Sequence, residues 1–240
     1  LSKSKWISKM NVTVDLIAKG EMSVVGRLVD ATNASLLAQI KDCDPQIKVI
    51  YKPVAGERPL WDFPDGSLAH REYAAFLLSD IANFDLVPFT VLREGPFGFG
   101  MVQEWVEIDE NVDVVDYGQG EDTQLRKMAL FDAIINNTDR KFGHLLVDKS
   151  GLLKGCDHGV CFHSEDKLRT VIWQFAGEQF TEEEVDILKT LEELDLESLF
   201  SPYLTLQEIS ALKNRIQGLK VSGEFPLPSE QWPAVPWPPV

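Results

Sequence analysis

The chain has 240 residues, 44% of them hydrophobic, which is enough to bury the core of one two-lobed domain or of two small domains. Its 23 Lys and Arg against 38 Asp and Glu give a formal net charge of −15, which excludes nucleic acids and anionic membranes as partners. Three cysteines and the absence of an apolar run of membrane length predict a cytoplasmic protein without a disulfide framework or membrane insertion.

The first half of the chain alternates between short apolar runs and turns. Apolar periodicity predicts a helix in residues 1–19, and a second helix over 68–83 follows an ordered loop at 56–66 and the N-cap Ser67. Five strands are expected, at 22–29, 36–40, 47–54, 87–93 and 100–106. These segments predict an antiparallel sheet with one helix packed against it.

The second half is mainly helical. The periodicity predicts helices over 123–135, 182–194 and 206–219, and the Pro- and Trp-rich residues 223–240 predict an extended tail. We therefore expect an α+β fold with an N-terminal sheet lobe over 1–105 and a helical lobe over 106–222.

Charged residues gather between apolar runs in the middle of the chain. Asp139 is followed by the cations Arg140 and Lys141, and His144 and Asp157 are potential metal ligands. Burying such charges is costly in a core, whereas a phosphoryl-transfer site needs a base, a charge neutraliser and metal ligands.

A lysine and a glutamate twenty positions apart could belong to the same site. Lys52 lies near the end of a predicted strand, and Glu72 lies on the following helix. A carboxylate on a helix can fix the ammonium of a strand lysine that reaches a phosphate. Two solvated surface charges are the alternative.

In this order the motifs resemble the lipid-kinase branch of the protein-kinase-like superfamily. That branch comprises phosphatidylinositol 3- and 4-kinase catalytic domains and bacterial HipA-type kinases, and the chain is most similar to a group of small actinobacterial kinase-like proteins. The matching segments are 51–57, 71–77, 86–90, 137–140 and 157–159. The resemblance covers residues 20–175 and implies a two-lobed protein-kinase-like fold.

The resemblance also implies a nucleotide site. It makes Lys52 the lysine on the phosphates of ATP and Glu72 its partner, and it places Glu104 and Val106 around the adenine. The chain has no G-x-G-x-x-G, so Thr32, Asn33 and Ser35 would have to supply the phosphate loop. An ordinary hairpin turn is the alternative there.

For catalysis, the resemblance implies that Asp139 faces the acceptor hydroxyl and that Asp157 is the principal Mg²⁺ ligand. Arg140 or Lys141 would offset the charge of the transferred group. The chain departs from the family at His144, where Asn is usual, and at Lys141, where His is usual. Imidazole is a poorer Mg²⁺ ligand than an amide oxygen, which favours Mn²⁺ or a single metal ion.

The cysteines suggest a competing metal site. Cys156, His158, Cys161 and His163 alternate closely enough to suggest zinc, although the C-x-x-C spacing is missing. Buried thiols in a core strand are the alternative.

Together these observations predict a kinase that uses ATP and Mg²⁺ or Mn²⁺ to phosphorylate a hydroxyl acceptor. A protein Ser or Thr and a small polyol both stay open as the acceptor. A nucleotide-binding pseudokinase and a nucleotidyl-transferring enzyme of the same fold are the alternative functions.

Overall fold

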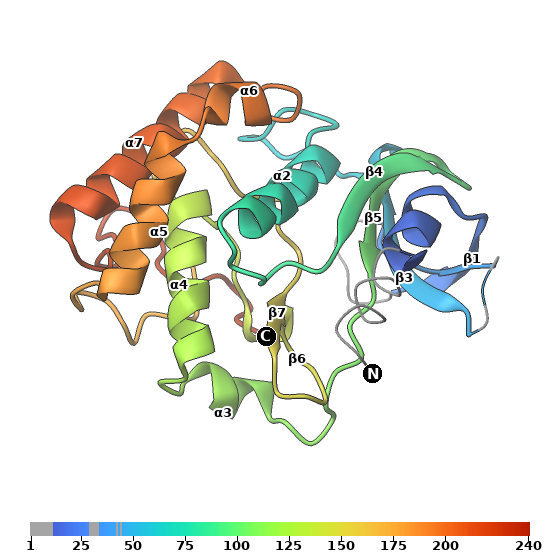
Figure 1. Ribbon diagram of the computed structural model, residues 1–240, viewed down its shortest axis with the longest axis horizontal. Coiled ribbons are helices and arrows are strands. Elements are labelled where there is room, and N and C mark those ends of the chain that lie inside the picture. Colours follow the sequence, from blue (N-terminus) through green and yellow to red (C-terminus); the bar gives the residue numbers. More distant parts are fainter. Residues whose placement is uncertain (1–11, 29–33, 42, 44) are drawn as a thin grey trace. The chain divides into compact units, whose positions relative to one another are not determined.

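The computed structural model describes residues 12–28, 34–41, 43 and 45–240 (Figure 1). The chain forms two compact units, a sheet unit of Leu1–Tyr73 with Pro88–Trp105, and a helical unit of Ala74–Val87 with Val106–Val240. Helix α2 (Leu68–Ile81) begins in the sheet unit and ends in the helical unit.

The sheet unit contains five antiparallel strands in the order β1-β2-β3-β5-β4, which confirms the predicted antiparallel sheet. Their bounds are β1 Met22–Arg27, β2 Leu36–Ile40, β3 Ile47–Pro53, β4 Thr90–Gly95 and β5 Gly98–Glu104. A short 3-10 helix, η1 (Val54–Gly56), follows β3. Residues 12–19 are helical and bury Ile17 in the core of this unit, where it joins Val49, Tyr51 and Val102.

Side-chain alternation along β3 decides where Lys52 lies. Val49, Tyr51 and Pro53 are buried in turn, so the residues between them, including Lys52, project from the opposite face of the sheet. The Tyr51 hydroxyl accepts a hydrogen bond from the Phe97 amide at 3.2 Å and donates to the Gly98 carbonyl, which fastens the β4–β5 turn.

The helical unit is built around α4 (Thr123–Ile135), in which every residue from Met128 to Ile135 is buried. Its other elements are α3 Val114–Gly118, η2 Phe142–His144, β6 Leu145–Val147, β7 Leu153–Gly155, α5 Glu182–Glu193, α6 Leu196–Phe200 and α7 Leu206–Ser222. The last turns of α2 join this core through Ala74, Ala75 and Leu78.

Capping explains where the long C-terminal helices begin. Thr181 and Glu184 form a capping box at the start of α5, and Thr205 and Glu208 form one at the start of α7. Helix α7 ends at Gly223, whose φ of 71° is a left-handed C-cap conformation that glycine adopts without strain.

Residues 223–240 contain no helix or strand, yet they pack on the helical unit. The Ala234 carbonyl accepts hydrogen bonds from the Thr170 amide at 3.0 Å and from the Trp173 indole at 2.8 Å. The Pro239 carbonyl accepts from the Phe142 amide at 2.9 Å, so the tail reaches the segment that follows Asp139.

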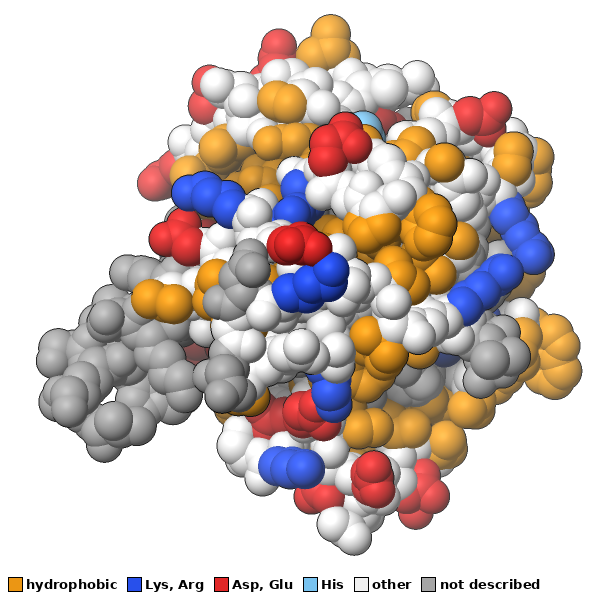
Figure 2. Space-filling model, turned by 90° about the vertical axis from the view of Figure 1, so that its right-hand side faces the viewer, with side chains coloured by type: hydrophobic (Ala, Val, Ile, Leu, Met, Phe, Trp, Pro, Cys, Tyr) orange, Lys and Arg blue, Asp and Glu red, His pale blue; other side chains and the backbone are white. Residues whose placement is uncertain are grey.

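Figure 2 shows how charges are distributed on one face. On the face that Figure 2 shows, the coloured Lys and Arg side chains lie scattered among acidic and apolar ones rather than in one basic patch. None of the helices in the described parts of the chain is long and apolar enough to cross a membrane.

The pairing of Pro53 with Gly100 yields a first prediction, because the two strands approach closely there. A Cβ at Gly100 would lie 2.4 Å from the Lys52 carbonyl oxygen and 2.7 Å from the Pro53 Cα. We expect Gly100→Ala to destabilise the protein by about 1–3 kcal/mol in urea unfolding, since backbone atoms must move.

Gly26→Ala in β1 is the matched control, because nothing lies within 4 Å of the added Cβ. Equal stability of the two variants would contradict the prediction.

Candidate active site

The segment that carries Asp139 begins where α4 ends. Asn136 has φ 53° and ψ 57°, a left-handed conformation that Asn tolerates better than most residues, and it turns the chain out of the helix. Its side chain donates to the carbonyls of His163 and Glu165 at 3.1 and 2.7 Å and accepts from the Lys167 amide at 2.9 Å. These bonds fix the direction in which residues 137–140 leave the helix.

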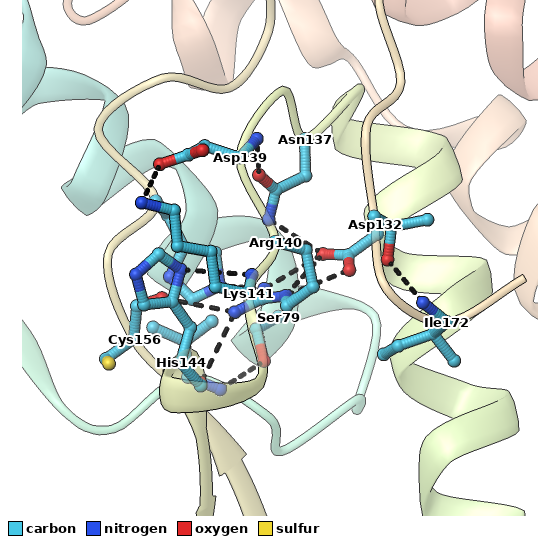
Figure 3. A network of polar contacts seen from close by, with 12 residues as sticks. Ser79, Asp132, Asn137, Asp139, Arg140, Lys141, His144, Cys156 and Ile172 are labelled. Carbon is cyan, nitrogen blue, oxygen red and sulfur yellow. Dashed lines mark hydrogen bonds and ion pairs between the residues drawn. The ribbon is translucent and has the colours of Figure 1, made fainter. Parts of the chain in front are cut away.

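A buried ion pair joins Arg140 of this segment to Asp132 of α4 (Figure 3). Asp132 and Arg140 are both fully buried, and the guanidinium binds both carboxylate oxygens at 2.9 Å. Asn137 also donates to Asp132, at 3.0 Å. Bidentate pairing of this kind has strict geometry, so it fixes Arg140 against the end of α4.

Arg140 also binds both neighbours of Asp157. It donates to the Cys156 carbonyl at 3.1 Å, and its Nη2 lies 2.8 Å from the His158 Nε2. One buried side chain therefore joins the segment of Asp139 to the segment of Asp157. The family resemblance implied that Arg140 or Lys141 offsets charge on the phosphoryl group. Because the Arg140 guanidinium is buried and engaged in this way, it is poorly placed for that role.

Asp139 itself is partly buried. Its amide donates to the Asn137 side chain at 3.0 Å, and its carboxylate lies 3.6 Å from the Lys141 ammonium. Burial raises the pKa of Asp139 above its ordinary value and the charge of Asp157 acts in the same direction, while Lys141 and Arg169 lower it. The carboxylates of Asp139 and Asp157 are thus close enough to interact.

Asp157 presents a half-exposed carboxylate from a left-handed turn with φ 59°. The His144 Nε2 lies 3.4 Å from one carboxylate oxygen, and the His144 Nδ1 accepts from the Lys141 amide at a long 3.4 Å. If Nδ1 is the acceptor, Nε2 carries the proton in the neutral ring. His144 then points an N–H at Asp157.

In the sheet unit, Lys52 and Glu72 form an ion pair of 2.5 Å, with side chains 17% and 2% exposed. Helix α2, which carries Glu72, is held by the Glu57 carboxylate, which accepts from the Leu68 and Ala69 amides at 3.1 and 2.8 Å. Ser67 stands at the N-cap position, as predicted, and its carbonyl accepts from the Arg71 amide at 3.2 Å, but its hydroxyl donates to the Pro64 carbonyl and does not cap the helix.

The other predicted nucleotide residues are less informative. Thr32 and Asn33 lie outside the described residues, and Ser35 is buried with its carbonyl bound to the Leu28 amide at 2.9 Å. Glu104 ends β5, where its amide donates to the Phe89 carbonyl at 2.8 Å. Val106 opens the second stretch of the helical unit.

Arg169 is a residue of this site that the sequence did not reveal. Its amide donates to the Asn137 carbonyl at 2.9 Å, its Nε to the Thr138 carbonyl at 2.7 Å, and its carbonyl accepts from the Arg140 amide at 3.1 Å. Its guanidinium lies 5.7 Å from the ring centre of Trp232 in the tail. No motif surrounds it, so no sequence signal could have identified it.

The zinc alternative gains no support. Within the described residues, no three His, Cys, Asp or Glu side chains gather as metal ligands would. Cys161 is fully buried and His158 is engaged with Arg140. The Cys161 thiol is buried, as the alternative predicted, but Cys156 is only partly buried and neither cysteine lies in a strand.

The fold of the chain is kinase-like, as two solved structures show. Two structures of the Golgi casein kinase match: one with Mn/ADP bound has a TM-score of 0.58 and 13% identity over 92% of this chain and 76% of that one. The other has a TM-score of 0.54 and 12% identity over 91% and 79%. The Helicobacter pylori proinflammatory kinase CtkA also matches, with a TM-score of 0.46 and 11% identity over 87% and 94%.

The family is shown by sequence. The chain is 38% identical to protein Rv2133c of Mycobacterium tuberculosis, in an alignment 261 positions long that covers 93% of this chain and 94% of that protein. The chain belongs to the family of protein Rv2133c. A scan of known family descriptions finds no match. The Golgi casein kinase structures confirm the kinase-like fold, and the narrower resemblance to phosphatidylinositol and HipA-type kinases stays a prediction.

The buried ion pair yields a second prediction. Asp132→Asn leaves the Arg140 charge buried without its counter-charge, which we expect to cost about 3–5 kcal/mol of the free energy of unfolding in urea titration. The double variant Asp132→Leu, Arg140→Met removes both charges and should recover part of this loss. A single variant within about 1 kcal/mol of the wild type would contradict it.

The pKa of Asp139 yields a third. Because the folded-state pKa is raised, the stability linked to this group is full below its unfolded pKa and is lost as pH rises through the folded pKa. Asp139→Asn cannot ionise, so we expect it to be more stable than the wild type at pH 7, with the difference shrinking as pH falls toward 4. Thermal unfolding across this range measures it, and an Asn variant less stable at pH 7 would contradict it.

Proposed function

We propose that the protein is an ATP-dependent phosphotransferase that moves the γ-phosphoryl group to a hydroxyl acceptor. The observation that carries this proposal is the arrangement around Arg140, which binds Asp132 and both neighbours of Asp157. That arrangement holds the two carboxylates of Asp139 and Asp157 close enough for the charge of Asp157 to help raise the pKa of Asp139. Positioning and electrostatics of this kind supply most of the rate in phosphoryl transfer.

Asp157 fits the role of principal ligand to Mg²⁺ or Mn²⁺. Mg²⁺ in phosphoryl-transfer sites is held by one or two carboxylates together with the substrate phosphates, so a dedicated cage of protein ligands is not needed. The half-exposed carboxylate of Asp157 meets this requirement. The bound metal ion would neutralise charge on the phosphate oxygens. The Golgi casein kinase, which shares the fold, has been solved with Mn/ADP.

His144 has a different role in this proposal from the one suggested by its place in the motif. With Nε2 protonated, it donates to Asp157 and orients that carboxylate rather than binding the metal ion itself. The usual Asn would supply a second metal-binding oxygen. We therefore propose a site in which a single metal ion is held chiefly by Asp157.

Asp139 would orient the acceptor hydroxyl and accept its proton. This requires the ionised carboxylate, which burial and the charge of Asp157 disfavour, and which the neighbouring charges of Lys141 and Arg169 favour. Lys141, whose side chain is 20% exposed, is the better candidate to offset charge on the transferred group, because Arg140 is buried. Arg140 and Arg169 would act as positioning residues.

Lys52 would bind the nucleotide phosphates. The ion pair of Lys52 with the nearly inaccessible Glu72 carries a desolvation cost, so it contributes little to the stability of the fold. A need to fix the position of the Lys52 ammonium explains the pair better. Two further parts of the proposal rest on the family resemblance alone. They place Glu104 and Val106 at the adenine, and Thr32, Asn33 and Ser35 at the phosphates. Burial of Ser35 makes it the least suited of the three.

The tail belongs to the proposed machinery as a brace. Trp232 packs on the charged groups of Lys167 and Arg169, at 5.0 and 5.7 Å from its ring centre. The Pro239 carbonyl holds the Phe142 amide. Through Arg169 and Phe142, the tail supports the backbone on both sides of Asp139.

The fourth prediction tests nucleotide binding. We expect ATP with Mg²⁺ or Mn²⁺ to raise the melting temperature of the wild type, and we expect little shift without a metal ion. Asp157→Ala should abolish the metal-dependent part, and Lys52→Met should weaken binding with either metal ion. A wild type that shows no shift with ATP, ADP or GTP under any condition would overturn the nucleotide site.

The same preparation tests catalysis. Asp139→Asn should lower turnover of ATP about 10²-fold or more while leaving the nucleotide shift in place, since general-base catalysis contributes about 10²–10⁴-fold. Mass spectrometry of the acceptor distinguishes a gain of phosphate from a gain of AMP. Binding without turnover, unaffected by Asp139→Asn, would indicate a pseudokinase instead.

A further inference from the structure

The end of the chain lies on the helical unit as an extended segment that contacts it through one face. From Trp232 onward burial alternates, so that Trp232 and Ala234 are half-buried and Pro236 is buried, while the residues between them are exposed. A period of two is that of an extended peptide laid against a surface. The segment therefore presents one row of side chains to the helical unit and the other row to solvent.

The helical unit holds this segment by its backbone carbonyls. The Ala234 carbonyl accepts from the Thr170 amide at 3.0 Å and from the Trp173 indole at 2.8 Å. The Pro239 carbonyl accepts from the Phe142 amide at 2.9 Å. Half of residues 232–239 are proline, which has no amide to donate and favours an extended backbone without internal hydrogen bonds. Aromatic side chains are a common means by which proteins bind peptides of this kind.

Trp232 anchors the segment by its ring. The ring centre lies 5.0 Å from the Lys167 ammonium and 5.7 Å from the Arg169 guanidinium, which are cation–π distances. Its indole N–H is buried without a hydrogen-bond acceptor among the described residues, which offsets part of this gain. Trp237, by contrast, is 89% exposed. The residues of the helical unit that hold the segment form a tail-binding face, which consists of Phe142, Lys167, Arg169, Thr170 and Trp173.

The connection between this segment and α7 is weakly held. Phe225 is buried, its amide donates to the Glu178 carbonyl at 2.9 Å, and its ring centre lies 4.9 Å from that of Phe180. Residues 227–231, which follow, are exposed, and part of this stretch lines a cavity of about 690 Å³ instead of packing on the core. Segments with few buried contacts open at a small cost in free energy. Residues 232–239 can therefore leave the surface while Phe225 stays in place.

We propose that the tail-binding face is a site for extended proline-rich peptides, and that residues 232–239 occupy it as a releasable intramolecular ligand. A tail on the same chain has a high effective concentration, which keeps the face occupied against free peptides. Arg169 of this face donates to the Thr138 carbonyl at 2.7 Å, and its carbonyl accepts from the Arg140 amide. Release of the tail would therefore loosen the backbone around Asp139 and leave α4 folded.

The fifth prediction tests release by native-state hydrogen exchange on the full chain. The amides of Phe142 and Thr170, whose acceptors lie in the tail, should exchange at least about tenfold faster than the buried amides of α4, since they need only local opening. Trp232→Ala should speed exchange at these two amides further, whereas the matched control Trp237→Ala should not. Exchange of the two amides as slow as that of α4 in the wild type would overturn the proposal.

Binding in trans is tested on the full chain with a protease site inserted in the exposed residues 227–231 and cut after folding. A labelled peptide of residues 229–240, in excess over the cut tail, should bind saturably in fluorescence anisotropy. The uncut protein should bind it at least about tenfold more weakly, because its own tail competes. A cut protein that keeps its helical circular dichroism but shows no saturable binding would overturn the site. Loss of helicity on cutting would do the same, since the tail would then belong to the core.

Peptide and protein variants locate the binding on the tail-binding face. A peptide with Trp232→Ala should bind the cut protein at least about tenfold more weakly, while the matched peptide with Trp237→Ala should bind as the parent does. Trp173→Phe in the protein keeps a ring but removes the indole donor to Ala234, which should weaken binding about 2- to 10-fold. Equal affinities for the Trp232→Ala and Trp237→Ala peptides would contradict the assigned face.

Discussion

The buried pair of Asp132 and Arg140 is the interaction on which the arrangement of Asp139 and Asp157 in the helical unit depends. Such a pair adds little to stability once desolvation is counted, so its value lies in geometry. Asp132 anchors the guanidinium to the end of α4, and the remaining donors reach Cys156 and His158 on either side of Asp157. Two acidic side chains far apart in the sequence are thereby held at one place by a residue that is itself inaccessible.

Local rules predicted much of the fold. Alternation and turn residues predict the strands, whereas the pairing of Lys52 with Glu72, which the structure shows, is implied by the family resemblance, because local spacing only allows it. The choice between Arg140 and Lys141 could not be made in the same way. Which of two adjacent cations turns inward depends on Asp132, eight positions earlier, and on carbonyl and imidazole groups supplied much later.

Other features were hidden because they rest on contacts between distant segments. Ser67 fits the local rule for an N-cap, but a carboxylate from the preceding loop, Glu57, reaches the first amides of α2 instead. Arg169 contacts the segment of Asp139 through its own backbone and through the Thr138 carbonyl, and backbone partners carry no sequence signature. The buried ion pair, by contrast, has a sequence signal. Asp132 falls on the buried face of a predicted amphipathic helix, where an acidic group needs a partner.

The tail gives this unit a particular order of assembly. Trp232 and Pro239 complete the contacts of Arg169 and Phe142, although they follow those residues at a considerable distance along the chain. During synthesis, the loop of Asp139 emerges from the ribosome well before the residues that brace it. In a nascent chain, the loop of Asp139 therefore gains its full set of supporting contacts only after residue 239 has been added and has emerged.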